Sequence, residues 1–193
     1  MNADDLQHAV TGTRAVMASV QPHQMAAPTP CGSWSVRDLI IHLVDAPVFT
    51  SVVLETGDSE GYSYDPIDPA ADDFLAGYDA AASALIAAFR VDGAMSRTVT
   101  MPVLGKLPGA SLVVLATCDA FVHGWDLAHA TGISADLDAD VAGNVLENIR
   151  PLVTEQMRGP DGTALFGTEV AVSSDASPAD RLAGFLGRRL PAN

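Results

Sequence analysis

Apolar residues recur at helical spacing along most of the chain, and polar or glycine- and proline-rich segments separate these runs. The pattern predicts five helices and a short sixth, with long connections after the second and the third. The expected helices are about Ala3–Val20, Ser35 to the segment ETGDSEG, Ala70–Arg90, Ala110–Thr131, Asp138–Met157 and a short final one from Pro178. We therefore expect an all-α helical bundle with long crossover loops.

Local signals mark several of these boundaries. Ser35 and Asp38 have the spacing of a capping box, in which each side chain accepts a hydrogen bond from the backbone amide of the other residue. Gly132 follows the fourth helix as a typical terminating glycine. Pro47 falls inside the second helix and predicts a kink rather than a break.

Two segments are expected to be irregular because glycine and proline interrupt them, namely QPHQMAAPTPCGSW and residues 56–69. Between the third and fourth helices, the alternating residues Val99, Met101 and Val103 predict a short extended stretch, with Gly105 in a turn. No repeat or low-complexity tract interrupts the pattern.

Composition narrows the class of protein. A chain of 193 residues with a mean hydropathy of +0.22 can bury the core of one domain of ordinary size. Its 24 acidic and 10 basic residues give a formal charge of −14, which disfavours binding to nucleic acid or to an anionic membrane. The acidic residues are spread along the chain, as is typical of charge that serves solubility.

The cysteines and the N-terminus point to a cytoplasmic protein. Cys31 and Cys118 are too few and too far apart for a secreted disulfide framework or a CxxC metal clip. The first residues carry acids where a signal peptide has basic ones. No apolar run approaches the 18 or more residues that a membrane span requires, so we expect no membrane partner.

The fourth predicted helix carries polar side chains on its inner face. Asp119, His123 and Asp126 are four and then three residues apart, and so fall within roughly 60° of one another on a helix. Leu112 and Leu115 lie close to the same face. We therefore expect the polar groups there to be buried, and a buried acid must be paired, hydrogen-bonded or bound to a metal.

The second helix offers a partner for this face. His42 lies in the apolar segment DLIIHLVDAP, where it is either a core histidine satisfied by a hydrogen bond or a ligand. If the two helices face each other, His42, Asp119 and His123 form a two-histidine, one-carboxylate set with open coordination positions, which suits Zn, Ni or Fe(II). Asp38 is assigned to the capping box and not to this set.

The rotation about the helix axis indicates whether two further polar residues of the fourth helix belong to the candidate site. Asp126, one turn beyond His123, is placed either to orient that ligand or to face solvent. His129 points roughly 240° away from His123 and is excluded from the site.

Three segments of the chain resemble a known family. APTPCGSWSVRDLIIHLV, DAFVHGWDLAHATG and the closing RLAGFLGRR are similar to actinobacterial proteins of the DinB-like superfamily, in the group related to mycothiol-dependent maleylpyruvate isomerase. The resemblance covers nearly the whole chain. It implies a four-helix bundle over residues 1–157, followed by a short C-terminal extension, residues 158–193, with a loop and a short helix that pack on the bundle.

The resemblance also implies a metal site and a thiol cofactor. Carried across by motif, the metal ligands are His42, Asp119 and His123, with Asp119 where the isomerases often have glutamate. The expected metal is zinc, with nickel or iron as alternatives, and the expected cofactor is a low-molecular-weight thiol such as mycothiol. A metal lowers the pKa of a thiol and so supplies a thiolate at neutral pH.

One departure from the family limits this inference. The characterised isomerases carry a further C-terminal domain that contributes to the active site, and here only the short extension follows. Isomerisation of maleylpyruvate itself is therefore a weaker expectation than the metal site.

The remaining residues of interest have structural interpretations beside functional ones. Cys31 either lies near the metal or shapes its loop, and Arg37 either contacts an anionic ligand or lies at the surface. Cys118 is expected to be a small packing residue rather than a nucleophile. Trp34 and Trp125 are expected to anchor helix ends.

Three functions follow as hypotheses. The first is a metal- and thiol-dependent transferase or isomerase that acts on a small electrophile. The second is a non-catalytic or stress-related module with a structural metal and a closed site. The third is a helical dimer in which His42 and His123 only satisfy core hydrogen bonds. The preferred oligomer is a homodimer that forms through one face of the bundle.

Overall fold

The computed structural model describes residues 1–63, 65–134, 137–160 and 162–190. The α-helices are α1 (Ala3–Met17), α2 (Val36–Thr56), α3 (Phe74–Phe89), α4 (Gly109–Thr131), α5 (Ala139–Ile149) and α6 (Pro178–Phe185). The strands are β1 (Thr98–Met101) and β2 (Gly105–Pro108), and short 3-10 turns occur at Pro22–Gln24, Ala94–Ser96 and Glu155–Met157.

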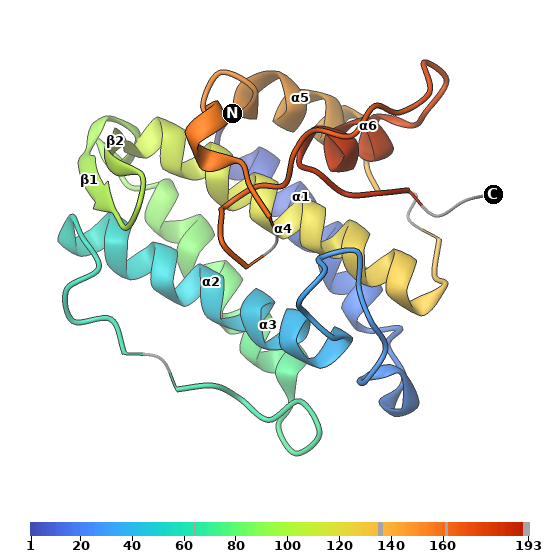
Figure 1. The fold of residues 1–193 in the computed structure, drawn as a ribbon. Helices are drawn as coiled ribbons and strands as arrows, with labels where there is room; N and C mark the ends of the chain where they lie inside the picture. Colours follow the sequence, from blue (N-terminus) through green and yellow to red (C-terminus); the bar gives the residue numbers. More distant parts are fainter. Residues whose placement is uncertain (64, 135–136, 161, 191–193) are drawn as a thin grey trace.

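Helices α1 to α4 form the bundle that the apolar pattern predicts. α1 packs against α4 and α3, and α2 packs against α3 and α4, so that α4 lies at the centre of the molecule (Figure 1). α5 and α6 pack on each other and on α4. Most of α4 is buried, including the large side chains of Phe121 and Trp125. Of the polar residues on its inner face, His123 and Asp126 are buried and Asp119 is half-buried.

The predicted capping box is present at the start of α2, and the predicted terminating glycine is present at the end of α4. The Asp38 amide donates to Ser35 Oγ, and the Ser35 amide donates to Asp38 Oδ2 at 2.9 Å. Gly132 ends α4 in the left-handed region, with φ 71°. α2 continues through Pro47 without a break.

Three helices are shorter than predicted. α1 ends at Met17 rather than Val20, with 3-10 hydrogen bonds in the last turn. α3 begins at Phe74 rather than Ala70, because Asp73 caps it by accepting from the Ala76 amide. α5 ends at Ile149 rather than Met157, because Pro151 has no amide hydrogen and so cannot continue the helical hydrogen bonds.

The expectation of a strictly all-α fold is wrong, because β1 and β2 form an antiparallel hairpin. Val99 pairs with Leu107 and Met101 with Gly105. Val99 is fully buried against the end of the bundle, whereas Val103, which was expected to continue the extended stretch, is exposed in the turn with φ 66°. The hairpin closes the end of the bundle where α2 finishes and α4 begins.

The C-terminal segment, residues 158–190, packs across α4 and α5. Leu182 and Phe185 of α6 share one apolar core with α1, α2, α4 and α5. Trp125 anchors α6, since its indole nitrogen donates to Asp180 at 3.0 Å. The division of the chain into a bundle and an extension at residue 157 stays a prediction.

Length and mean hydropathy alone would allow two helices to cross a membrane, contrary to the expectation from the sequence. The most apolar 18-residue windows of α2 and α4 have mean hydropathies of 1.5 and 1.2. In the fold, 44% of the α2 window and 72% of the α4 window are buried. The core helices of a bundle meet the same criterion.

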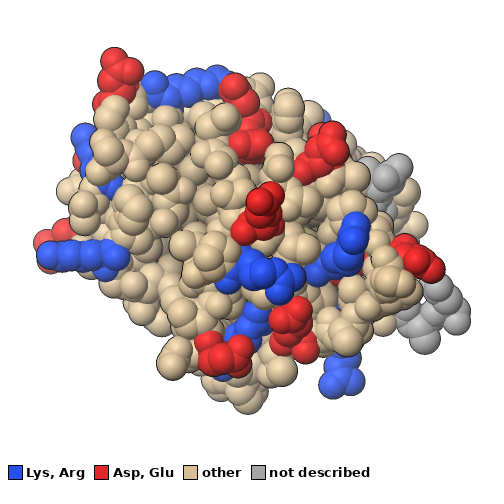
Figure 2. Space-filling model, turned by 90° about the horizontal axis from the view of Figure 1, so that it is seen from above, with Lys and Arg blue, Asp and Glu red and all other residues tan. Residues whose placement is uncertain are grey.

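Charged side chains are dispersed on the face that Figure 2 shows. Acidic and basic residues alternate there over a wide surface of other residues, without a large patch of one sign. This distribution agrees with the spread of acidic residues along the sequence.

The contact between α1 and α4 depends on Gly124, which follows His123 in α4. Gly124 lies against Thr13, and a Cβ at this position would overlap Thr13 Oγ1 and lie 3.0 Å from Thr13 Cβ. The Thr13 hydroxyl donates to the Ala120 carbonyl at 2.7 Å. A side chain at position 124 would therefore separate the two helices that carry the core.

We expect Gly124→Ala to lower the free energy of unfolding by about 2–3 kcal/mol, because the added methyl group overpacks this contact. The matched control is Gly143→Ala in α5, where the new Cβ has nothing within 4 Å and should stabilise the helix by about 0.5–1 kcal/mol. Urea denaturation of both variants measures the difference. Equal stability of the two variants would contradict the proposed close approach.

Candidate metal centre

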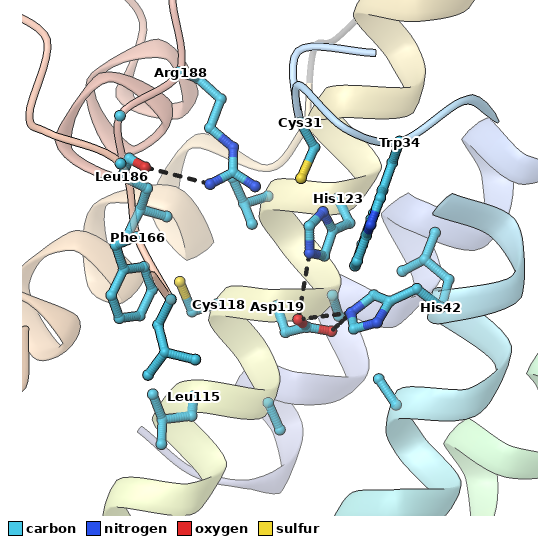
Figure 3. A pocket seen from close by; sticks show the side chains of 18 of the residues that line it. Cys31, Trp34, His42, Leu115, Cys118, Asp119, His123, Phe166, Leu186 and Arg188 are labelled. Atoms are coloured by element: carbon cyan, nitrogen blue, oxygen red, sulfur yellow. Dashed lines mark hydrogen bonds and ion pairs between the residues drawn. The ribbon is translucent and has the colours of Figure 1, made fainter. Parts of the chain in front are cut away.

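Three side chains that the sequence analysis selected come together where α2 faces α4. His42 Nε2 lies 3.0 Å from Asp119 Oδ1 and 3.2 Å from Asp119 Oδ2. His123 Nε2 lies 3.4 Å from Asp119 Oδ1. Figure 3 shows both imidazoles pointing toward this carboxylate, and their ring centroids lie 4.8 Å apart. The candidate ligand atoms all lie within 4.8 Å of one another.

A second layer of polar residues holds His123. Its Nδ1 lies 3.0 Å from Asp126 Oδ2, and because an ionised carboxylate only accepts hydrogen bonds, Nδ1 carries the proton. The other ring nitrogen, His123 Nε2, faces Asp119, where it donates to the carboxylate when the ring is protonated and would offer its lone pair to a metal ion. Asp126 is completely buried, so of its two predicted placements the structure shows the one that orients His123.

Arg188 completes this layer from the C-terminal segment. Its guanidinium donates to both carboxylate oxygens of Asp126, at 3.3 Å from Nε and 3.0 Å from Nη2. Gly187, with φ 92°, turns the chain after α6 and packs so closely on Gly167 that a Cβ would overlap it. This turn directs Arg188 back toward α4 (Figure 3).

The charges of the cluster perturb one another. Burial alone would raise the pKa of Asp119, but the imidazoles of His42 and His123 hold it well below its ordinary value. Burial would lower the pKa of His123, but Asp119 and Asp126 raise it. Burial would also raise the pKa of Asp126, which Arg188 and His123 lower. Two ionised carboxylates in this interior favour a cation, either a proton on an imidazole or a metal ion.

The donor set fits a single divalent metal ion. Zinc binds imidazole nitrogen and carboxylate oxygen at about 2.0–2.2 Å, and donor atoms as close together as these can reach one ion with small side-chain adjustments. A second group, Cys31, His123 and Asp126, also lies within 4.8 Å. That group fits less well, because Asp126 already bonds to Arg188 and to His123 Nδ1.

Aromatic side chains enclose the cluster on one side. The ring of Trp34 lies 4.7 Å from that of His42 and 5.5 Å from that of His123. Trp34 was expected to anchor the end of a helix, and in the structure it covers the candidate ligands (Figure 3). A tryptophan in this position excludes water from one flank of the site.

The cluster opens into a cavity of about 1180 Å³. α2 and α4 form two of its walls, and the loop with Cys31 and Trp34 forms another. The C-terminal segment contributes Gly159, Gly162, residues 164–170 and residues 186–189, and a few residues of α1, α3 and the hairpin complete the lining. The C-terminal extension is therefore part of the site, which the sequence analysis did not predict.

The remaining candidates have mainly structural roles. Arg37 forms an ion pair with Asp68 at 2.8 Å, and both side chains are largely exposed. His129 stacks on Trp125 at 3.7 Å between ring centroids, away from the cluster, as its angle on the helix predicts. Cys118 is buried, and burial together with Asp119 raises the pKa of its thiol to about 12, so it stays a neutral packing residue.

Cys31 lies close to the candidate metal ligands, which is one of the two placements expected from the sequence. It is half-buried in the cavity wall beside His123 (Figure 3). Arg188 is the principal residue that the sequence analysis missed. The motif RLAGFLGRR contains it, but nothing in the local pattern relates it to an aspartate 62 residues earlier.

We expect Arg188→Ala to lower the free energy of unfolding by about 3 kcal/mol, because Asp126 would remain buried without its cation. Arg189→Ala is the matched control, since that side chain is exposed and its loss should change stability by less than about 0.5 kcal/mol. Urea denaturation of the metal-free proteins tests both. A loss of the same size in the two variants would show that the ion pair to Asp126 does not stabilise the fold.

Comparison with known proteins agrees with this architecture. Residues 6–128 match the family model of the mycothiol maleylpyruvate isomerase N-terminal domain. Two uncharacterised proteins of Mycobacterium tuberculosis, MT0763 of strain CDC 1551 / Oshkosh and Rv0738 of strain ATCC 25618 / H37Rv, are each 38% identical over 185 residues, which is 94% of either chain.

A solved structure shares the fold. The crystal structure of a histidine-to-alanine mutant of the mycothiol-dependent maleylpyruvate isomerase superposes with a TM-score of 0.58 at 14% identity, over 80% of this chain and 70% of that one. The helical bundle is thus a DinB-like fold with an added hairpin. The chain belongs to the DinB-like family of the mycothiol maleylpyruvate isomerase N-terminal domain.

Proposed function

We propose that this protein binds one divalent metal ion through His42, Asp119 and His123 and uses it to activate a low-molecular-weight thiol toward a small electrophile. The observation that carries the proposal is the convergence of these three side chains at the wall of a large cavity. The family membership supports the thiol, and mycothiol is the thiol that the relatives' name gives.

The metal would supply one kind of chemistry, since coordination lowers the pKa of a thiol and yields a nucleophilic thiolate at neutral pH. Zinc is our first choice, and nickel or iron(II) are compatible with the same ligands. Three protein ligands leave at least one position for the thiol, as in catalytic rather than structural zinc sites.

The protein's own residues position and shield the reactants. Asp126 and Arg188 fix the ring of His123 through its Nδ1 hydrogen, which keeps the metal-binding nitrogen directed at Asp119. Trp34 limits access of water from the side of the loop. The C-terminal segment contributes Gly167, Thr168 and Gly187 to the cavity wall near Arg188, and the polar part of the thiol would lie against this wall.

The reaction we propose is S-transfer or isomerisation. In S-transfer the thiol sulfur bonds to an electrophilic carbon, the leaving group departs with the electron pair of the broken bond, and the thiol proton passes to solvent. In isomerisation the sulfur adds and is expelled again, so that the thiol is regenerated.

A non-catalytic module with a structural metal is the second candidate. The proximity of Cys31 to His123 favours it, since a fourth protein ligand would close the site. Under either proposal the partners are small molecules and the protein acts in the cytoplasm, where thiols stay reduced. The homodimer stays a prediction.

The first test is the metal content of the untagged protein, measured by elemental mass spectrometry. We expect about one equivalent of a divalent ion in the wild type and less than a tenth of that in His42→Ala, because two ligands hold such an ion poorly. His8→Ala is the control, since His8 is exposed on α1. Absence of metal from the wild type after reconstitution with zinc would refute the proposal.

A further inference from the structure

The cavity extends from the metal-ligand cluster toward the hairpin end of the bundle. α2 and α4 are antiparallel neighbours. The Arg97 carbonyl accepts from the Gly109 amide at the start of α4, and the guanidinium of the same residue donates to the carbonyls of Leu54 and Glu55 at the end of α2. Lining residues after His42 and before Asp119 therefore lie on the same side of the cluster. We call this part the apolar arm, and its principal residues are Pro47, Thr50, Met101, Leu112, Leu115 and Ala116.

The charges of the cavity lie elsewhere. Among the described lining residues, the carboxylates and guanidinium groups belong to Asp119 or to the C-terminal segment, as Glu169, Arg188 and Arg189. Thr50 is a polar member of the arm, and its hydroxyl donates to the Ala46 carbonyl at 2.8 Å. Tyr78 also lines the cavity, and its buried hydroxyl has no hydrogen-bond partner among the described residues. In Figure 3, Leu115 lies on the opposite side of Asp119 from Arg188 and Cys31.

This division decides which ligands each end can hold. An anion in the arm would lose its hydration without gaining a counter-charge, which is costly. Arg188 cannot compensate, since Asp126 already binds it. A hydrocarbon group loses nothing there and gains about fourfold in affinity for each buried methylene.

The size of the cavity allows two molecules to bind together. Sites for one drug-sized ligand have volumes of about 300–1000 Å³, and this cavity exceeds that range. A polar thiol at the end with Arg188 leaves the arm available for a second reactant, with Asp119 and its histidines between the two.

We propose that the electrophile of this protein is an uncharged molecule with a hydrocarbon body that lies in the apolar arm. This inference rests on the proposed function and deepens it by naming the substrate class. It separates the protein from a maleylpyruvate isomerase, whose substrate carries two carboxylates. The reactive carbon would lie at the inner end of the arm, beside Asp119, where the thiol reaches it.

The test measures binding without turnover. Butanamide, hexanamide and octanamide are titrated into zinc-loaded and metal-free protein by calorimetry, with maleate as the charged comparison. Trp34, beside the cluster, supplies an independent fluorescence signal. We expect octanamide to bind at least tenfold more tightly than butanamide in both forms, and maleate to bind no more tightly than butanamide to the metal-free protein.

Variants locate the binding in the arm. Ala116→Phe fills it and should abolish the dependence on chain length, whereas Ala84→Phe, on the exposed face of α3, should leave it unchanged. Leu115→Arg adds a cation and should reverse the preference toward maleate, which gives a positive signal if the first variant folds poorly.

The outcomes separate this inference from the metal site. An affinity that does not change with the chain length of the amide would overturn the inference, even in a protein that binds zinc. The same dependence on chain length in wild type and Ala116→Phe would also overturn it. A steep gradient in a protein that binds no zinc would support the arm and leave the metal proposal refuted.

Discussion

The carboxylate of Asp119 lies between two imidazoles across the interface of α2 and α4, and the rest of the structure is arranged around that negative charge. A carboxylate in an apolar bundle is stable only with a compensating cation or hydrogen-bond donors. His42 and His123 supply these groups in the metal-free protein, and a metal ion can replace the protons that they carry. The same two helices supply the apolar walls, so fold and site depend on one helix pair.

The compensation extends outward in layers to the end of the chain. His123 is hydrogen-bonded to Asp126, and Asp126 is paired with Arg188. The turn at Gly187 positions Arg188. The short C-terminal segment is thereby tied to a candidate ligand of α4 and completes the cavity wall. The cavity therefore has a polar end near Arg188 and an apolar arm near Leu115. The bundle supplies mostly hydrocarbon side chains to the lining, and the C-terminal segment supplies most of the charged ones.

Local patterns in the sequence predicted the bundle and the polar face of α4, because helical phase relates Asp119, His123 and Asp126 directly. The place of His42 opposite this face followed only if the two helices face each other, and the role of these residues as metal ligands stays a prediction. The capping box at Ser35 and the terminating glycine at 132 were also predicted from the sequence. The ion pair of Arg188 could not be predicted, since it joins positions 62 residues apart that no period relates. The premature end of α5 was overlooked although Pro151 signals it, and the hairpin was underestimated because Val103 lies in its turn and not in a strand.

X-ray absorption of the zinc-loaded protein, with and without N-acetylcysteine, shows whether the metal ion binds a thiol. We expect two imidazoles and light oxygen ligands around zinc in the absence of thiol, and one added sulfur at about 2.3 Å in its presence. A sulfur ligand already present without the thiol would indicate that Cys31 closes the site. That result, or a spectrum that the thiol leaves unchanged, would contradict a thiol-activating metal centre.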